Sequence, residues 1–396
     1  MADCAPAARD DFLSTLSTVQ AETRTAVSAK YASDKDSMWS FWKAFIAPLK
    51  GVDPYLNSIE PHLHVSFLQV FAHKVRHRRD QASGKPIRAQ RVQDYLRTVA
   101  QEMRMGSRWR TDPRYGDHLT QHLELILQRR SYSKSDPPPE KVKPLPVPLI
   151  RHACANQPNT PQGRATSSAL INGYFYLLRP GEYVKSSSAP ADAHPFRLQD
   201  TTFHTPTGPV NGATGSVARL KQATQITMNF PDQKNQDKDQ PITHGDTADP
   251  VLSPLKAVLS QVLHLRKHKA PPTTPLCTYY VQNKPHQVTA RDLTNTLRRS
   301  CSIMGAPLGL QPTDISVRAL RNGGCVALIR AGVDPLEARL MGRWRSWAMV
   351  EYLQAQSLDS TGYAQRMLDA GTYVIPRHQF LPKDVHSKAQ PYVIEA

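Results

Sequence analysis

Two arginines stand in places where a surface charge is not expected. Arg179 ends the apolar stretch GYFYLL, and Glu182 follows it by three residues. Arg321 lies among apolar residues in ISVRALRNGGCVALIRAG, beside a Gly-Gly pair that permits close approach to the backbone. A guanidinium so placed must either be paired or face a ligand. The alternative to ligand binding is structural ion pairing, for which the candidate carboxylates are Glu182, Asp314 and Glu337. Spacing alone leaves both interpretations open.

A third set of residues lies in MGRWRSWAMVEYLQ. Arg343 and Trp344 precede Tyr352, which is nine residues beyond Arg343. The simplest interpretation of Tyr352 is a helix tyrosine that packs its ring into the core. The usual enzyme motifs are absent: the chain has no GxGxxG after a strand, no GxxxxGK[ST], no HExxH and no GxSxG. Two His pairs at helical spacing lie among Lys and Arg without a third ligand, so we expect no metal site.

The charge balance indicates a polyanionic partner. The 396 residues contain 50 Lys and Arg against 33 Asp and Glu, a formal charge of +17. Such an excess favours nucleic acid as the partner. Seven cations cluster between residues 72 and 91 and are predicted to contact DNA: Lys74, Arg76, Arg78, Arg79, Lys85, Arg88 and Arg91. The alternative for this run is a solvated basic face or a nuclear-import patch.

Composition also excludes several classes of protein. No apolar run approaches the roughly 20 residues that span a bilayer. The N-terminus MADCAPAARDDF carries acids where a secretory signal needs a basic start and an apolar stretch. The five cysteines form no Cys-x-x-Cys pair, which is typical of reduced thiols. We therefore expect an intracellular protein with no membrane association.

Periodicity divides the chain into four parts. Residues 1–130 are predicted to form a small helical bundle, because apolar residues such as those at 92, 95, 96, 99 and 103 share one helical face. Residues 131–148 are rich in proline and predict a semi-rigid linker. Residues 149–375 mix helices with strand-like alternation at 196–204, 217–230 and 240–244, which predicts a β-hairpin sheet. Residues 376–396 form a polar tail. The fold class expected is mainly α with a small β-hairpin sheet.

In this order the motifs resemble the tyrosine recombinases, or phage integrases. The family's G-L-R-x-[ST/G]-E pattern is matched by Leu178-Arg179-Pro180-Gly181-Glu182, and its H-x-L-R box by Arg318-Ala319-Leu320-Arg321. Its L-G-[HW] motif is matched by Met341-Gly342-Arg343, and its nucleophile by Tyr352. ITMNFPDQKNQDKDQPITH is similar to the family's hairpin, which places the hairpin lysine at Lys234, with Lys221 and Lys238 as alternatives. The residues within these motifs are most similar to those in recombinases of DIRS-type and Crypton-type mobile elements. The resemblance extends over residues 165–371, and the helical N-terminal part agrees only in kind.

The resemblance implies a site-specific recombinase that cuts and rejoins double-stranded DNA through a 3′-phosphotyrosine. Arg179 and Arg321 would bind the non-bridging oxygens of the phosphate, with Glu182 holding Arg179. Tyr352 would attack the phosphorus, and Lys234 would protonate the departing 5′ oxygen. Arg343, or Trp344 through its indole N–H, would hold a non-bridging oxygen. A homo-tetramer on DNA is implied, with no metal, cofactor or ATP, in the nucleus if the host is eukaryotic.

Two positions depart from the family pattern. Arg318 stands where the family has histidine, and Arg343 stands where it has His or Trp. Arginine cannot act as a general base near neutral pH, so Arg318 is a poor acceptor for the tyrosine proton. These departures keep two alternatives open: a domesticated DNA-binding protein of the same fold that has lost catalysis, and a DNA-relaxing enzyme similar to type IB topoisomerases.

Overall fold

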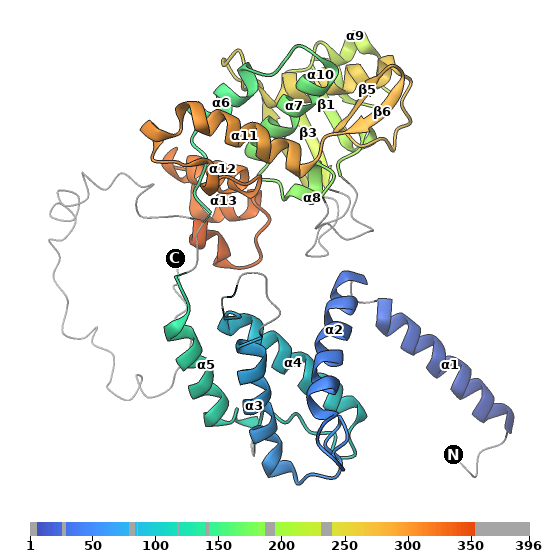
Figure 1. Cartoon of the computed structure of the whole chain (residues 1–396). Helices are drawn as coiled ribbons and strands as arrows, with labels where there is room; N and C mark the ends of the chain where they lie inside the picture. Colours follow the sequence, from blue (N-terminus) through green and yellow to red (C-terminus); the bar gives the residue numbers. More distant parts are fainter. Residues whose placement is uncertain are drawn as a thin grey trace, which may run out of the picture. The chain divides into compact units, whose positions relative to one another are not determined.

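The structure is a computed structural model of the chain, and it describes residues 6–25, 29–78, 84, 86–116, 119–138, 142–186, 195–230 and 240–352. These residues form two compact units (Figure 1), the first containing the described residues up to 138 and the second those from Val142 onward. The described part is mainly helical with small antiparallel sheets, so the predicted fold class is confirmed.

The first unit is helical. Its helices are α1 (Pro6–Thr25), α2 (Ala29–Ile46), α3 (His64–Arg76), α4 (Ala89–Gly106) and α5 (Leu123–Ser135), with a 3₁₀ turn η1 (Pro61–Leu63) before α3. Trp42 and Phe71 are fully buried and meet edge to face, with ring centroids 5.0 Å apart. The apolar stripe of α4 that ends at Met103 is buried, as its periodicity predicts. The aromatic residues of α2 and α3 therefore form the core of a bundle.

The second unit holds the remaining elements. Its helices are α6 (Val147–Ala155), α7 (Pro161–Phe175), α8 (Pro180–Tyr183), α9 (Val217–Leu220), α10 (Pro254–Lys267), α11 (Ala290–Met304), α12 (Arg318–Arg330) and α13 (Pro335–Met341). Its 3₁₀ turns are η3 (Leu198–Asp200), η4 (Ala306–Leu308), η5 (Pro312–Asp314) and η6 (Trp347–Tyr352). Helix α7 is buried along most of its length, because α6, α10, α12 and a strand pack on it.

Two antiparallel sheets complete the second unit. The larger consists of β1 (Thr201–Thr205), β2 (Gly208–Asn211), β3 (Gln225–Phe230) and β4 (Gln240–Gly245), in the order β2-β1-β3-β4. Thr227 of β3 pairs with Thr202 on one side and Thr243 on the other, which sets the register. The smaller sheet pairs β5 (Thr278–Val281) with β6 (Lys284–Gln287). One face of the larger sheet packs into the main core through Phe203, Ile226 and Met228.

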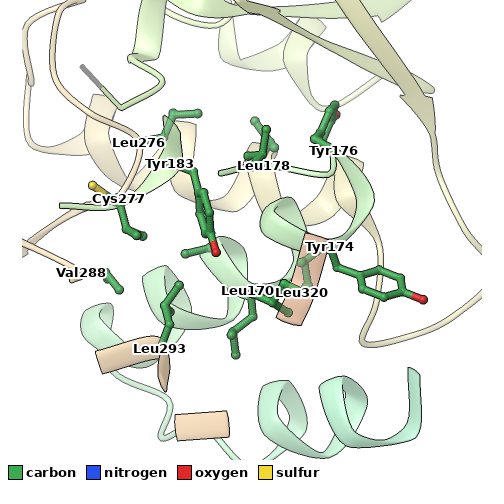
Figure 2. Packing of buried hydrophobic residues seen from close by; sticks show 14 of the residues in the cluster. Leu170, Tyr174, Tyr176, Leu178, Tyr183, Leu276, Cys277, Val288, Leu293 and Leu320 are labelled. Atoms are coloured by element: carbon green, nitrogen blue, oxygen red, sulfur yellow. The ribbon is translucent and has the colours of Figure 1, made fainter. Parts of the chain in front are cut away.

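The core of the second unit surrounds the end of α7. Leu170 and Tyr174 of α7 lie among Tyr183, Leu293 and Leu320, which come from three other elements (Figure 2). Tyr183 is 4 % exposed, and burial raises the pKa of its hydroxyl far above the ordinary value. This packed layer holds fixed the turn that leaves α7, where the candidate site begins.

The structure differs from three expectations about local structure. The predicted strand 217–230 starts with a helical turn, because Ser216 caps α9 by accepting the Arg219 N–H at 3.3 Å, so β3 begins only at Gln225. The sequence also predicts a short helix over residues 346–356, whereas its described part forms the 3₁₀ turn η6. The β5–β6 hairpin was not predicted, because its two turn residues, Gln282 and Asn283, adopt positive φ without a glycine.

The predicted linker is also shorter than expected. Helix α5 continues to Ser135, and α6 begins at Val147. Between them, the Leu145 N–H donates to the Ala319 carbonyl at 3.3 Å and the Asn322 side chain donates to the Val142 carbonyl at 3.1 Å. The end of the proline-rich stretch is thus packed against α12 in the second unit.

The Gly-Gly pair of α12, Gly323 and Gly324, allows this close packing. A Cβ on Gly323 would lie 2.3 Å from the carbonyl oxygen of Leu145, and one on Gly324 would lie 2.3 Å from that of Tyr174. Any side chain at either position would therefore separate α12 from α7 or from the 142–146 segment. Glycine lets α12 approach closely enough for Arg321 to reach the turn after α7.

Candidate functional site: an arginine cluster around one turn

The site is built on the turn that ends α7. Leu178 N–H donates to the Gly173 carbonyl at 3.1 Å, and Leu177 between them has φ +49°. This is the left-handed C-terminal cap of a helix, a position that usually holds glycine. Leucine there costs roughly 1–2 kcal/mol and needs compensation from its surroundings. The compensation comes from two arginines that bind the Leu177 carbonyl.

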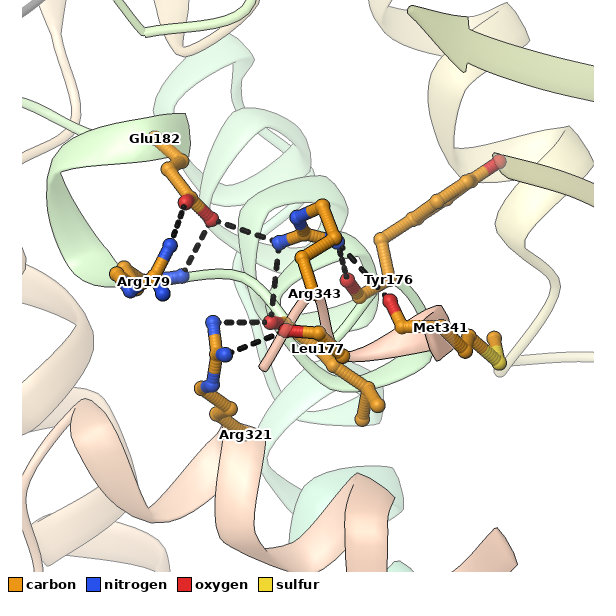
Figure 3. A network of polar contacts seen from close by, with 8 residues as sticks. Tyr176, Leu177, Arg179, Glu182, Arg321, Met341 and Arg343 are labelled. Atoms are coloured by element: carbon orange, nitrogen blue, oxygen red, sulfur yellow. Dashed lines mark hydrogen bonds and ion pairs between the residues drawn. The ribbon is translucent and has the colours of Figure 1, made fainter. Parts of the chain in front are cut away.

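Arg321 is the first of these arginines. It is 5 % exposed, and its Nη1 donates to the Leu177 carbonyl at 2.9 Å while Nη2 donates to the Gly342 carbonyl at 2.6 Å. The Trp344 ring lies beside it, with the guanidinium carbon 4.4 Å from the ring centroid. Arg321 therefore ties the end of α7 to the turn after α13 (Figure 3).

Arg343 is the second. Its Nη1 donates to the carbonyls of Tyr176 and Met341 at 3.2 and 3.1 Å, and its Nη2 donates to Leu177 at 3.4 Å. The same Nη2 is 3.0 Å from Glu182 Oε2, and the guanidinium carbon lies 3.8 Å from the ring centroid of Phe230.

The side chain of Arg343 is 1 % exposed. Burial lowers the pKa of Arg343 to about 10, the Glu182 carboxylate opposes that shift, and the charge of Arg179 adds to it. The resemblance implies that Arg343, or else Trp344, holds a non-bridging phosphate oxygen. The structure instead places its guanidinium in the interior as the partner of Glu182, which corrects that expectation.

Arg179 is the more accessible partner of the same carboxylate. It caps α8, and Pro180 provides the first helical residue. Its backbone N–H donates to Glu182 Oε2 at 2.7 Å and its Nη1 donates to Oε1 at 2.9 Å. The side chain of Arg179 is 27 % exposed. Glu182 thus holds Arg179 as predicted, and it also bridges to Arg343, which the sequence analysis did not foresee.

The cluster therefore joins four predicted site residues from three separate parts of the chain (Figure 3). Arg179 and Arg343 share the Glu182 carboxylate, and Arg321 binds the same turn through backbone carbonyls. These four side chains together carry a formal charge of about +2 near neutral pH. Trp344 lies against it. Asp314, another candidate carboxylate, pairs with Lys143 at 2.9 Å. A cluster of this charge, with one partly exposed guanidinium, is suited to a phosphate group.

Other predicted site residues lie elsewhere or outside the described part. Arg318 is exposed at the start of α12, and Lys221 is exposed at the end of α9. Lys234 and Lys238 fall outside the described residues. Tyr352 ends η6, and its side chain is also outside the described part. Its position relative to the arginines therefore stays a prediction. Among the described residues, no group of three or more His, Cys, Asp or Glu could hold a metal ion.

The predicted DNA-contacting run divides into surface and interior residues. Lys74, Arg88 and Arg91 are exposed. Arg78 is half-buried, with its guanidinium 4.4 Å from the Phe41 ring centroid and its Nη1 donating to the Tyr95 hydroxyl at 3.0 Å. Arg79 and Lys85 lie outside the described residues.

Arg76 corrects the prediction for this run. It is 3 % exposed, and it pairs with Asp136 and donates to the Ile87 carbonyl. It also donates to the Ser135 hydroxyl at 3.0 Å. Arg76 is therefore an internal residue that ties the end of α3 to the end of α5, and it is not part of the basic surface.

Comparison with solved structures finds DNA recombinases at low similarity. The integrase of the Tn1549 transposon in complex with transposon right-end DNA is 10 % identical, with a TM-score of 0.43, over 85 % of this chain and 99 % of that one. The XerH site-specific recombinase bound to its difH substrate is 11 % identical, with a TM-score of 0.43, over 80 % and 71 %. XerA recombinase is 12 % identical, with a TM-score of 0.34, over 84 % and 99 %. No family model and no curated protein matches the chain. These values are too low to establish family membership or activity.

Proposed function

We propose that the chain is a DNA strand-transfer enzyme of the tyrosine-recombinase type, encoded by a mobile element. The observation that carries the proposal is the convergence of Arg179, Arg321 and Arg343 on one turn, where Arg179 and Arg343 share the Glu182 carboxylate. The sequence indicated these arginines through their apolar surroundings and the order of the motifs, and a positive cluster of this kind suits the charge of a phosphodiester in transfer. The basic composition agrees with a DNA partner.

In the proposed reaction, the scissile phosphate binds at Arg179, whose side chain is partly exposed, and the buried Arg321 stabilises its charge from the same turn. The Tyr352 oxygen attacks the phosphorus, its proton leaves to solvent, and a phosphotyrosine bond forms as the bond to the 5′ oxygen breaks. Lys234, or else Lys221 or Lys238, gives a proton to the departing 5′ oxygen. The reverse attack by another 5′ hydroxyl rejoins the strand, so no ATP is needed. Strand exchange would use four copies of the chain on two duplexes, in the nucleus if the host is eukaryotic.

A covalent-trapping assay tests the proposal. A nicked suicide duplex, which loses the leaving strand after cleavage, should give a slower-migrating protein–DNA band that resists denaturant. Tyr352→Phe should abolish the band. Arg179→Ala should reduce its rate by about a hundred- to a thousand-fold while duplex binding changes little. A band that persists in Tyr352→Phe would refute the nucleophile, and parallel loss of binding and cleavage in Arg179→Ala would refute its role at the phosphate.

The alternative is a DNA-binding protein of the same fold without catalysis. The specific observation in its favour is the burial of Arg343, which leaves the family's usual His or Trp position occupied by an internal ion pair. In that case the suicide duplex is bound but never trapped. Plasmid relaxation without joined products would instead favour a topoisomerase-like activity.

A further inference from the structure

A basic groove outside the arginine cluster lies in the first unit, between the start of α4 and the end of α5. It has a volume of about 370 Å³, and its polar lining comes from Arg88, Gln90, Arg129, Ser133 and Asp136. Arg88 and Arg129 are exposed, so both guanidinium groups are accessible from solvent. Arg129 and Ser133 are one helical turn apart on α5 and therefore present their side chains on the same face.

Among the described residues that line the groove, the one carboxylate is Asp136, and its charge is already neutralised. Asp136 pairs with the buried Arg76 and accepts the Ala89 N–H at 2.8 Å. Burial alone would raise the pKa of Asp136, but these hydrogen bonds and the charges of Arg76 and Arg88 hold that pKa below its ordinary value. Asp136 is thus ionised and matched by Arg76, and the charges of Arg88 and Arg129 remain to attract an anion.

The donors of the groove fit a phosphodiester. Two guanidinium groups, the Ser133 hydroxyl and the Gln90 amide all donate hydrogen bonds, and groups of these types provide most protein contacts to DNA phosphates. Arg91, one turn beyond Arg88 and also exposed, extends the positive surface along α4. We propose that this groove holds a backbone phosphate of duplex DNA, through Arg88 and Arg129. The inference rests on the proposed function, because it assumes that duplex DNA is the substrate.

The chain offers a matched control for the test. Arg130 is the next residue on α5 and is also exposed, but it does not line the groove. Arg129→Gln and Arg130→Gln in the full-length protein therefore remove the same charge from adjacent positions. Binding of a fluorescent duplex is measured by anisotropy from 50 to about 300 mM KCl.

Loss of one phosphate contact should make the negative slope of log K against log salt shallower by about 0.9. Near 0.1 M salt this corresponds to an affinity that is weaker by roughly eightfold. We expect this change for Arg129→Gln on every duplex sequence, and an unchanged slope for Arg130→Gln. A second pair of variants adds one carboxylate each: Ser133→Glu places it in the groove, and Ser131→Glu places it outside. Both variants change the net charge of the protein by the same amount. We therefore expect Ser133→Glu to weaken DNA binding more than Ser131→Glu does. Equal effects within either pair would overturn the groove assignment.

Failure of this inference is distinguishable from failure of the proposed function. If the nicked duplex is trapped through Tyr352 but Arg129→Gln binds like Arg130→Gln, the groove is wrong and the enzyme stands. If no covalent band forms but the two variants differ as expected, the groove binds DNA in a protein without catalysis.

Discussion

Replacement of Glu182 by Gln tests the central ion pair of the arginine cluster. The amide keeps the shape of the carboxylate and an acceptor for the Arg179 N–H, but it removes the negative charge that lies 3.0 Å from the buried Arg343. Removal of one member of a buried pair costs about 3–5 kcal/mol, because the other charge stays in the interior without compensation. For a unit of this size each kcal/mol shifts Tm by about 2–4 °C, so Glu182→Gln should lower Tm by roughly 6–20 °C.

The matched variant is Arg179→Gln. It removes the other guanidinium on the same carboxylate, but that side chain is 27 % exposed and the pair is screened by water. We expect a loss of at most about 1 kcal/mol. The double variant Glu182→Gln with Arg343→Met should cost less than the sum of the single changes, because it removes both buried charges together.

Thermal unfolding of the full chain at pH 7, followed by circular dichroism, measures all of these variants. A Glu182→Gln protein as stable as Arg179→Gln would refute the reasoning, since Arg343 would then not depend on Glu182. Additive losses in the double variant would refute it as well.

Three further predictions concern stability and binding. The pKa of His244 is lowered by burial, with a hydrogen bond to the Phe175 carbonyl opposing the shift, so the neutral ring is favoured in the folded state. Stability should therefore fall as pH drops below about 6.5, and His244→Gln should remove part of that slope in a series of urea midpoints. Arg76→Gln should destabilise the first unit by about 3 kcal/mol in denaturant unfolding, because Asp136 loses its buried partner, and the uncompensated Asp136 carboxylate in the groove should weaken binding of duplex DNA. Gly324→Ala should lower Tm, although alanine is the better helix former by about 1 kcal/mol, because its methyl would meet a carbonyl oxygen of α7 at 2.3 Å; a raised Tm would contradict this packing.

The spacing of apolar residues predicted the regular helices and strands of the fold. The buried stripe of α4 and the strands β1, β3 and β4 follow from periodicities of 3.6 and 2. The pairing of Arg179 with Glu182 was predicted because both lie within one helical turn of chain. Recognition of Arg321 as part of the same site depended on the order of motifs along the chain, since its partners are backbone carbonyls that no residue pattern marks.

Other features depend on tertiary packing and were not visible in local patterns. Arg343 has a φ of +56°, a backbone conformation that the sequence does not indicate for arginine, and its side chain is buried against Glu182. For Arg76 a signal was present but was not used. It follows the buried Leu68 and Ala72 at helical spacing, on the face of α3 that points into the core. The basic run around it made a surface position the simpler interpretation.

The contact between the arginine cluster and the Leu177 carbonyl should tolerate substitution of the side chain at position 177. Because Arg321 and Arg343 bind a main-chain oxygen, the contact itself does not depend on which side chain occupies position 177. It depends on the number of residues between the end of α7 and Arg179, since one insertion or deletion there would turn a different peptide group toward the guanidiniums. Conserved loop length, rather than conserved residue identity, should therefore be the evolutionary signature of this turn among homologues that keep the cluster.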